Sequence, residues 1–162
     1  MNRILYVALV FLIISSALSA AEADKIKVNN GVLSLSGEIE FIHGSDTIKN
    51  ESFPVIDAIA LFMKENPDVK ILRIEGYCSS MTDENSNLEL SKLRAMSVAK
   101  AVMSRGVECR RLFASGFGSA LPFSSSVIHA DHITAVIAAG KFRKPGIMPV
   151  DGGGIVAGDP CK

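Results

Sequence analysis

A polar loop followed by a helix carries the residues that could bind a charged ligand. Residues 75–95 read EGYCSSMTDENSNLELSKLRA, and the spacing N-x-x-L-S-x-x-R-A within them contains Asn87, Ser91 and Arg94. On a helix, residues three or four apart share a face, so these side chains can face the loop that precedes them. Two interpretations follow at this point: Arg94 meets an anion near the loop, or it is a solvated helix residue.

Catalytic and metal-binding patterns are absent from the sequence. There is no G-x-S-x-G turn, no H-E-x-x-H helix and no close Cys/His pair with an orienting acid. The histidines are His43, His129 and His132, and the last two would face opposite sides of a strand. The glycine turns at 44–47 and 116–119 open no long helix with a lysine, unlike phosphate loops. We expect neither hydrolase activity nor a metal or other cofactor.

Apolar periodicity predicts how this loop is positioned. Helices should end at Asn66-Pro67-Asp68 and, through a glycine stop, at Gly106. Two strand-helix-strand units with helices on one face predict an α/β (α+β) two-layer sandwich, a mixed sheet covered by helices. The predicted order is strand 37–48, helix 50–65, strand 69–77, helix 86–105, strand 109–118 and strand 132–140.

The N-terminal residues 1–21 are typical of a secretory signal peptide. Arg3 precedes an apolar run at 4–14, and small residues follow, so cleavage is expected between Ser19 and Asp24. The run is too short for a membrane-spanning helix of about 20 residues. We therefore expect a mature chain without a transmembrane segment, in an exported compartment.

The mature chain should consist of one domain with flanking segments. Residues 22–36 form a lead-in with a turn signal at Asn29-Asn30-Gly31, and residues 37–140 form the domain. Residues 141–162 are rich in Gly and Pro without periodicity, which predicts a flexible tail. Without the one basic residue of the signal peptide, the basic residues of the mature chain nearly balance its 17 acidic residues. A nucleic-acid partner is not expected, because it would require a basic face.

Three cysteines remain after export, namely Cys78, Cys109 and Cys161. The first two flank the helix predicted over 86–105, which is about 30 Å long. A disulfide needs α-carbons within about 7 Å, so these two should not pair with each other. Cys161 could reach either of them, and free or partly buried thiols are the other interpretation.

Further motifs accompany the helix pattern at consistent spacings. They are I-x-F-x-x-G-S at 39–45, E-N-P at 65–67, I-E-G-Y at 74–77, G-V-x-x-x-R-L at 106–112 and G-F-G-x-x-x-P at 116–122. With these motifs, residues 37–139 resemble the OmpA-like C-terminal domain family. This family comprises the peptidoglycan-binding modules of outer-membrane anchors, peptidoglycan-associated lipoproteins and flagellar stator proteins.

The resemblance implies a non-catalytic domain with a β-α-β-α-β-β OmpA-like fold. Such domains bind the diaminopimelate side chain of the peptidoglycan stem peptide. Arg94 is then expected to pair with the ligand carboxylate, for which a planar guanidinium is a two-pronged donor. An aspartate in the family's G-H-T-D stretch would take the ligand ammonium.

Ser79 departs from this family pattern. The G-H-T-D stretch aligns with residues 76–79, so Ser79 stands in place of the aspartate. A hydroxyl cannot neutralise an ammonium, and losing a charge-assisted partner costs about 1.5–3 kcal/mol, or about ten- to a hundredfold in affinity. Asp83 or Glu84 could restore the anion from the same loop. The alternative is that these two acids cap the coming helix.

The late part of the family pattern is also eroded. Ser126, His129 and His132 stand where Asn, Arg and Asn are usual, and Ile133-Thr134 replace paired arginines. The candidate ligand-binding residues are Arg94, Ser79, Asp83, Asn87, Ser91, Ser126 and His132.

Two functions are compatible with these residues. The first is a periplasmic domain that binds peptidoglycan through a weakened or altered pocket and supports cell-envelope anchoring. The second is a structural or interaction subunit of an envelope-spanning assembly, such as a secretion system, in which peptidoglycan binding is lost. Both imply envelope protein partners that associate the chain with the outer membrane or cell wall.

Overall fold

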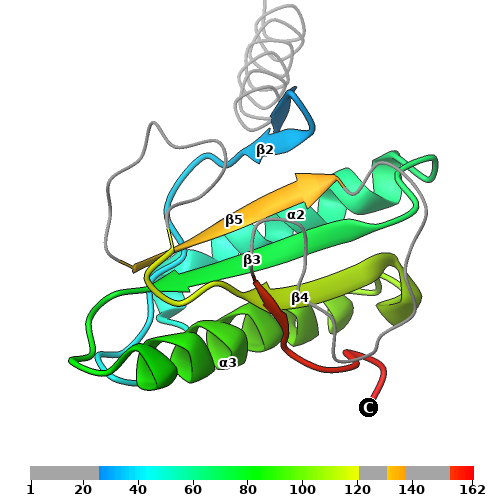
Figure 1. The fold of residues 1–162 in the computed structure, drawn as a ribbon. Helices are drawn as coiled ribbons and strands as arrows, with labels where there is room; N and C mark the ends of the chain where they lie inside the picture. Colours follow the sequence, from blue (N-terminus) through cyan, green and yellow to red (C-terminus); the bar gives the residue numbers. More distant parts are fainter. Residues whose placement is uncertain (1–25, 121–130, 138–153) are drawn as a thin grey trace, which may run out of the picture.

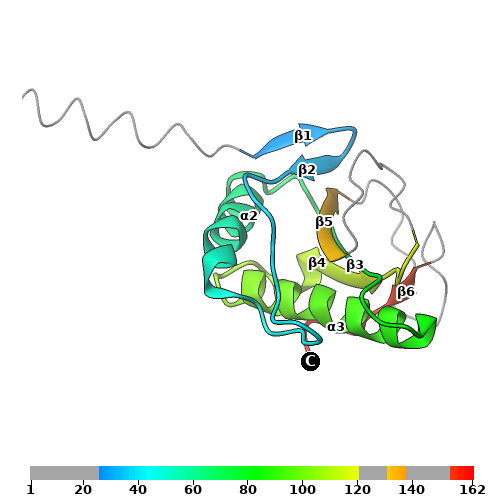
Figure 2. The same cartoon turned by 90° about the vertical axis from the view of Figure 1, so that its left-hand side faces the viewer.

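A mixed sheet with helices on one side organises the chain (Figures 1 and 2). The computed structural model describes residues 26–120, 131–137 and 154–162. The predicted two-layer α/β sandwich is confirmed. The strands are β1 (Lys27–Asn29), β2 (Val32–Ser34), β3 (Leu72–Cys78), β4 (Leu112–Gly116), β5 (Asp131–Ile137) and β6 (Ile155–Val156). The helices are α2 (Phe53–Glu65) and α3 (Glu84–Met103), with 3-10 turns η1 (Asn50–Ser52) and η2 (Cys109–Arg111).

Strand β3 is central in the sheet order β1-β2-β5-β3-β4-β6. It runs parallel to β4, with Gly76 opposite Gly116. It runs antiparallel to β5, with Cys78 opposite Asp131. The carboxyl end of β3 therefore lies between two neighbouring strands, where the chain leaves the sheet and enters the polar loop before α3.

The two helices bury their apolar stripes against the sheet. Helix α2 begins with a proline in its first turn and ends where the backbone amide of Asn66 bonds to the Phe62 carbonyl. Helix α3 is followed by Gly106, whose φ of +88° suits the predicted glycine stop. The helical residues of the core are Val55, Ile56, Ile59, Ala60, Met63, Ala95, Val98, Ala99 and Val102.

Two glycines allow α3 to approach the sheet closely. A β-carbon at Gly76 would lie 2.1 Å from the carbonyl oxygen of Ser91, and one at Gly116 would lie 2.5 Å from the Ser91 Oγ. Such distances leave no room for a side chain at either position. The glycines on β3 and β4 therefore determine how deeply the middle of α3 sits on the sheet.

The strand predicted over 37–48 is wrong. This segment forms only an isolated bridge between Phe41 and Ile48. Its backbone folds back on itself, since the Ile42 amide donates to the Thr47 carbonyl at 2.9 Å. Gly44, at φ +67°, lies within the reversal. The glycine turn therefore determines the backbone here, and the apolar alternation on either side of it does not form a strand.

The lead-in contains more structure than expected. The turn signal is confirmed, because Asn30 and Gly31 both have positive φ, at 50° and 81°. They join β1 and β2 as an antiparallel hairpin, the connection that consecutive positive-φ residues favour. The hairpin continues the sheet through Val32, which lies opposite Val136 of β5.

The last residues of the chain are not a tail without regular structure. Strand β6 adds to the edge of β4, with Val156 opposite Ser115 and the Ala157 amide donating to the Ala114 carbonyl at 2.9 Å. Cys109 and Cys161 form a disulfide, and Cys78 is a buried free thiol. The expectation that Cys78 and Cys109 do not pair is confirmed. The alternative that all three cysteines are free thiols is wrong for Cys109 and Cys161.

Other expectations concern residues that lie outside the described ranges. These are the signal peptide, the segment 121–130 with Ser126 and His129, and residues 138–153. Among the residues that the structure describes, no helix is long and apolar enough to span a membrane.

Reduction of the disulfide should destabilise the domain. The bond closes a separation of 52 residues, for which the chain-entropy estimate is about 4 kcal/mol. Urea unfolding with and without reductant should show this difference in the free energy of unfolding. The double variant Cys109→Ser/Cys161→Ser is the control and should be insensitive to reductant. Equal unfolding midpoints for oxidised and reduced wild type would contradict this prediction.

Candidate ligand-binding site

Arg94 is buried, with only 4% of its surface exposed. Its Nε donates to the Ser45 carbonyl at 3.0 Å, and its guanidinium carbon lies 4.9 Å from the centre of the Phe41 ring. One terminal nitrogen is 3.8 Å from the Sγ of Cys78. The guanidinium thus lies between α3, the end of β3 and the loop 41–48. Arg94 is not a solvated helix residue.

This environment fixes the direction of the guanidinium. A buried charge is stable only where hydrogen bonds replace water, and the Ser45 carbonyl meets that need at Nε. The ring of Phe41 adds a cation–π contact at one face. A guanidinium has five N–H donors in a planar fork, so holding it in this way suits recognition of a carboxylate or another planar anion.

Asn87 organises the loop between β3 and α3. Its Nδ2 donates to the Met81 carbonyl at 3.1 Å, and its Oδ1 accepts from the Met81 amide at 2.9 Å. The thiol of Cys78 lies 3.6 Å from the same oxygen. Both ends of the amide are therefore engaged by the loop. Asn87 faces the loop as the helix spacing predicted, and it holds the loop's shape.

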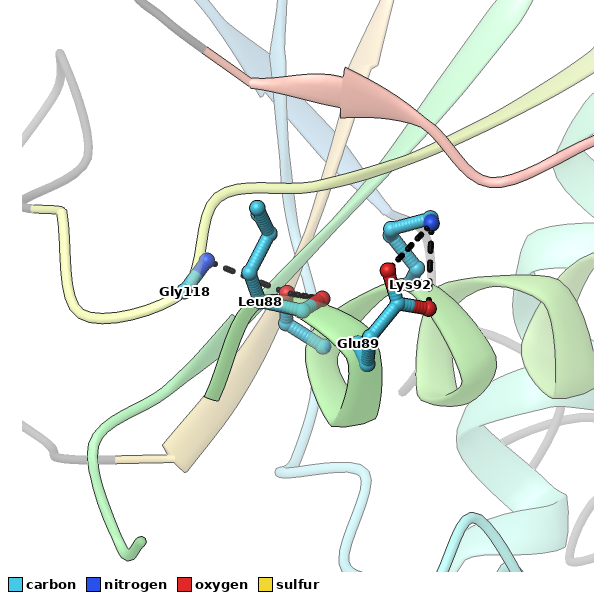
Figure 3. Close-up of polar contacts among 5 residues, drawn as sticks. Leu88, Glu89, Lys92 and Gly118 are labelled. Carbon is cyan, nitrogen blue, oxygen red and sulfur yellow. Dashed lines mark hydrogen bonds and ion pairs between the residues drawn. The ribbon is translucent and has the colours of Figure 1, made fainter. Parts of the chain in front are cut away.

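Ser91 fastens α3 to the turn that follows β4. Its Oγ donates to the Leu88 carbonyl at 2.7 Å and accepts from the Gly118 amide at 3.0 Å. Figure 3 shows the Gly118 amide directed at the helix near Leu88, with the ion pair of Glu89 and Lys92 beside it on the same helix. Ser91 is fully buried, so its hydroxyl contributes to packing of the helix next to Arg94.

Asp83 is the N-cap of α3. Its Oδ2 accepts from the amide of Ser86 at 2.8 Å and from the Ser86 hydroxyl at 2.9 Å. These hydrogen bonds lower the pKa of the Asp83 carboxyl below its ordinary value. The carboxylate is exposed and caps α3, as the capping alternative predicted.

Glu84 is engaged in a different contact. Its carboxylate accepts from the hydroxyl of Ser119 at 2.5 Å and from the Ser119 amide at 3.0 Å. The side-chain bond and then the backbone bond from Ser119 lower the pKa of Glu84. Glu84 therefore connects the first turn of α3 to the glycine turn after β4.

Tyr77, at the second position of the G-H-T-D alignment, belongs to a separate network. Its hydroxyl donates to Glu75 at 2.7 Å, and its ring stacks on Phe117 with centroids 5.1 Å apart. Burial, followed by the charge of Glu75, raises the pKa of Tyr77. Glu75 is itself paired with Arg73 at 2.5 Å. Both partners of Glu75, Arg73 and Tyr77, therefore lie on its own strand, β3.

The remaining predicted residues are placed only in part. Ser79 is exposed and directly follows β3, in the loop that Asn87 holds. The backbone of His132 lies opposite Tyr77 in β5. The thiol of Cys78 contacts both Arg94 and Asn87, which brings these two predicted residues together. Ser91 and Asp83 instead hold the two ends of the first turns of α3 through Gly118 and Ser86.

The loop 41–48 contributes residues that sequence reasoning did not assign to the site. Phe41 and Ser45 contact Arg94, and Asp46 accepts a hydrogen bond from the hydroxyl of Ser97 at 3.0 Å. The available signal was the I-x-F-x-x-G-S motif, which contains both Phe41 and Ser45. Among the described residues, no cluster of His, Cys, Asp and Glu side chains could hold a metal ion.

The fold and the site together define a small mixed α/β domain with a buried arginine beside a polar loop. The sequence profile of the OmpA family matches residues 40–133, more than half of the chain. The chain belongs to the OmpA family.

Individual relatives agree with this assignment. "Probable lipoprotein YiaD" of Escherichia coli (strain K12) is 31% identical over 98 residues, which are 60% of this chain and 44% of that protein. The chain thus matches less than half the length of this curated relative.

Solved structures share the fold. An outer membrane protein from Borrelia burgdorferi B31 has a TM-score of 0.56 at 24% identity, covering 71% of this chain and 96% of the other. The peptidoglycan-associated lipoprotein from Burkholderia pseudomallei has a TM-score of 0.50 at 18% identity, covering 64% and 89%.

The cap at Asp83 should make stability depend on acid pH. Because the folded-state pKa is lowered, the contribution is present above the unfolded pKa of about 4 and is lost as pH falls through the folded value. Asp83→Asn keeps a capping side chain without the charge. Urea unfolding between pH 7 and pH 2 should show wild type losing stability relative to Asp83→Asn as pH falls. Parallel pH profiles for the two proteins would contradict a charged cap.

Proposed function

We propose that this chain is a non-catalytic, periplasmic domain that binds peptidoglycan and supports cell-envelope anchoring. In this proposal Arg94 binds the carboxylate of the diaminopimelate side chain in the stem peptide. Membership of the OmpA family supports the general role. A solved structure of the same fold is named a peptidoglycan-associated lipoprotein, which is consistent with a cell-wall ligand.

The observation that carries the proposal is the position of the Arg94 guanidinium. It is buried, and residues of the chain itself, Ser45 and Phe41, set its orientation. An arginine that is already ordered loses little side-chain entropy on binding. Its charge also acts more strongly on a carboxylate in a partly desolvated position than in water. These properties suit an anion receptor.

The proposed pocket is weaker than one with an aspartate at position 79. Ser79 can accept a hydrogen bond from an ammonium but does not neutralise it, which costs about 1.5–3 kcal/mol. The two nearby acids already have other partners, because Asp83 caps α3 and Glu84 is bonded to Ser119. Neither can replace the missing aspartate without giving up these bonds. We therefore expect binding to the wall that improves when an acid is restored.

A second candidate function is supported by the same arginine. Its contacts with Ser45, Phe41 and Cys78 also brace the loop 41–48 against α3 and β3. A residue used only as a brace would leave the domain as a structural or interaction subunit of an envelope-spanning assembly, such as a secretion system. Loss of wall binding with an intact fold would favour this function.

Sedimentation with purified sacculi distinguishes the two functions. The mature protein should sediment with sacculi, Arg94→Ala should not, and Ser79→Asp should bind more tightly, because it places an acid at the position where the family pattern has one. Circular dichroism would verify that each variant is folded, and Arg94→Lys tests charge without the planar fork.

Arg110→Ala is the matched control, because Arg110 is an exposed arginine in η2, beyond the far end of α3. It should sediment as the wild type does. If wild type stays in solution and Ser79→Asp gains nothing, the peptidoglycan proposal is wrong and the second function stands.

A further inference from the structure

We propose that Asp46 supplies part of the negative charge that position 79 lacks, by pairing with the ammonium of the ligand whose carboxylate Arg94 binds. This inference rests on the proposed function and assigns a specificity residue to the same site. It concerns the loop 41–48, which lies outside the segment where the family pattern locates its acid.

Asp46 is tied to Arg94 through its neighbour in the chain. The Arg94 Nε donates to the carbonyl of Ser45 at 3.0 Å, so the backbone immediately before Asp46 lies against the guanidinium. The reversal of the loop, closed by the bond from the Ile42 amide to the Thr47 carbonyl, holds this arrangement. Asp46 is thus the acid attached to the peptide that Arg94 contacts.

The side chain of Asp46 is directed at α3 rather than away from it. Its Oδ2 accepts from the hydroxyl of Ser97 at 3.0 Å. Ser97 is three residues after Arg94 in α3, and residues at this spacing are neighbours on a helix surface. The carboxylate and the guanidinium therefore lie along one side of the helix. A ligand whose ammonium and carboxylate share one carbon needs two opposite charges placed in this way.

The charge of Asp46 is not neutralised within the described residues, where it forms no ion pair. Its hydroxyl partner is neutral, and a carboxylate has about four acceptor positions, so the bond to Ser97 leaves capacity for an ammonium. Asp46 is also only half buried, which allows a ligand to reach it.

The other acids near the loop are used differently. Asp83 accepts two hydrogen bonds from Ser86 at the start of α3. Glu84 is bonded to Ser119, and Glu75 is paired with Arg73 and bonded to Tyr77. Moving any of these carboxylates to a ligand would break contacts that hold the fold, whereas Asp46 can meet an ammonium where it stands.

The test measures binding of two stem tripeptides by isothermal titration calorimetry. One carries free diaminopimelate, and the other carries the same residue with its side-chain amine acetylated, which removes the ammonium and keeps the carboxylate. Asp46→Asn is the test variant, because its amide oxygen can still accept from Ser97 and so preserves the loop. Asp68→Asn, the same change at an exposed position after α2, is the control.

For the free peptide, Asp46→Asn should weaken binding about ten- to a hundredfold, and Asp68→Asn should bind as wild type does. For the acetylated peptide, wild type and Asp46→Asn should bind equally weakly, because the ammonium that Asp46 recognises is gone. Thermal melting of Asp46→Asn should match wild type.

Other outcomes would overturn the assignment. If Asp46→Asn binds the free peptide as tightly as wild type while Arg94→Ala does not bind, Asp46 is not the ammonium partner and the proposed function survives. An equal loss of affinity for both peptides in Asp46→Asn would show that Asp46 shapes the loop without recognising the ammonium. If wild type binds neither peptide and does not sediment with sacculi, both the proposed function and this inference are wrong.

Discussion

A guanidinium withdrawn from water must be given acceptors, and this requirement shapes the region around Arg94. The loop 41–48 turns back so that the Ser45 carbonyl meets Nε. Phe41 covers one face of the group. A chain that only needed a solvated arginine would not require this arrangement. The same contacts that stabilise the buried charge also fix its direction, which the proposed binding of a carboxylate requires.

The position of Arg94 depends in turn on how α3 meets the sheet. Gly76 and Gly116 let the backbone of the helix approach β3 and β4, and Ser91 fixes the helix to the turn at Gly118. Asn87 holds the loop that precedes the helix. Residues of the N-x-x-L-S-x-x-R-A pattern therefore have different roles. Asn87 and Ser91 position the helix and the loop, and Arg94 is the residue of the proposed anion site.

The main elements could be predicted from periodicity, because α2, α3, β3 and β4 bury long or regular apolar stripes. The segment 37–48 could not, since its alternation resembles a strand while a glycine turn folds it back. Strand β6 has two residues and leaves no pattern. In the site, helix spacing identified Arg94, but its acceptor at Ser45 is a backbone carbonyl. Every residue has one, so the I-x-F-x-x-G-S motif could mark the segment but not this contact.

The most direct measurement of the central claim is nitrogen-15 NMR of the arginine side chains during titration with the diaminopimelate tripeptide. In the free protein the Arg94 Nε–H should exchange slowly, because it is buried and bonded to Ser45. The terminal nitrogens of Arg94 should then shift on addition of peptide, with Arg110 unchanged. A slowly exchanging Nε–H with no response to saturating peptide would show that Arg94 is only a brace, and would contradict its role as the anion receptor.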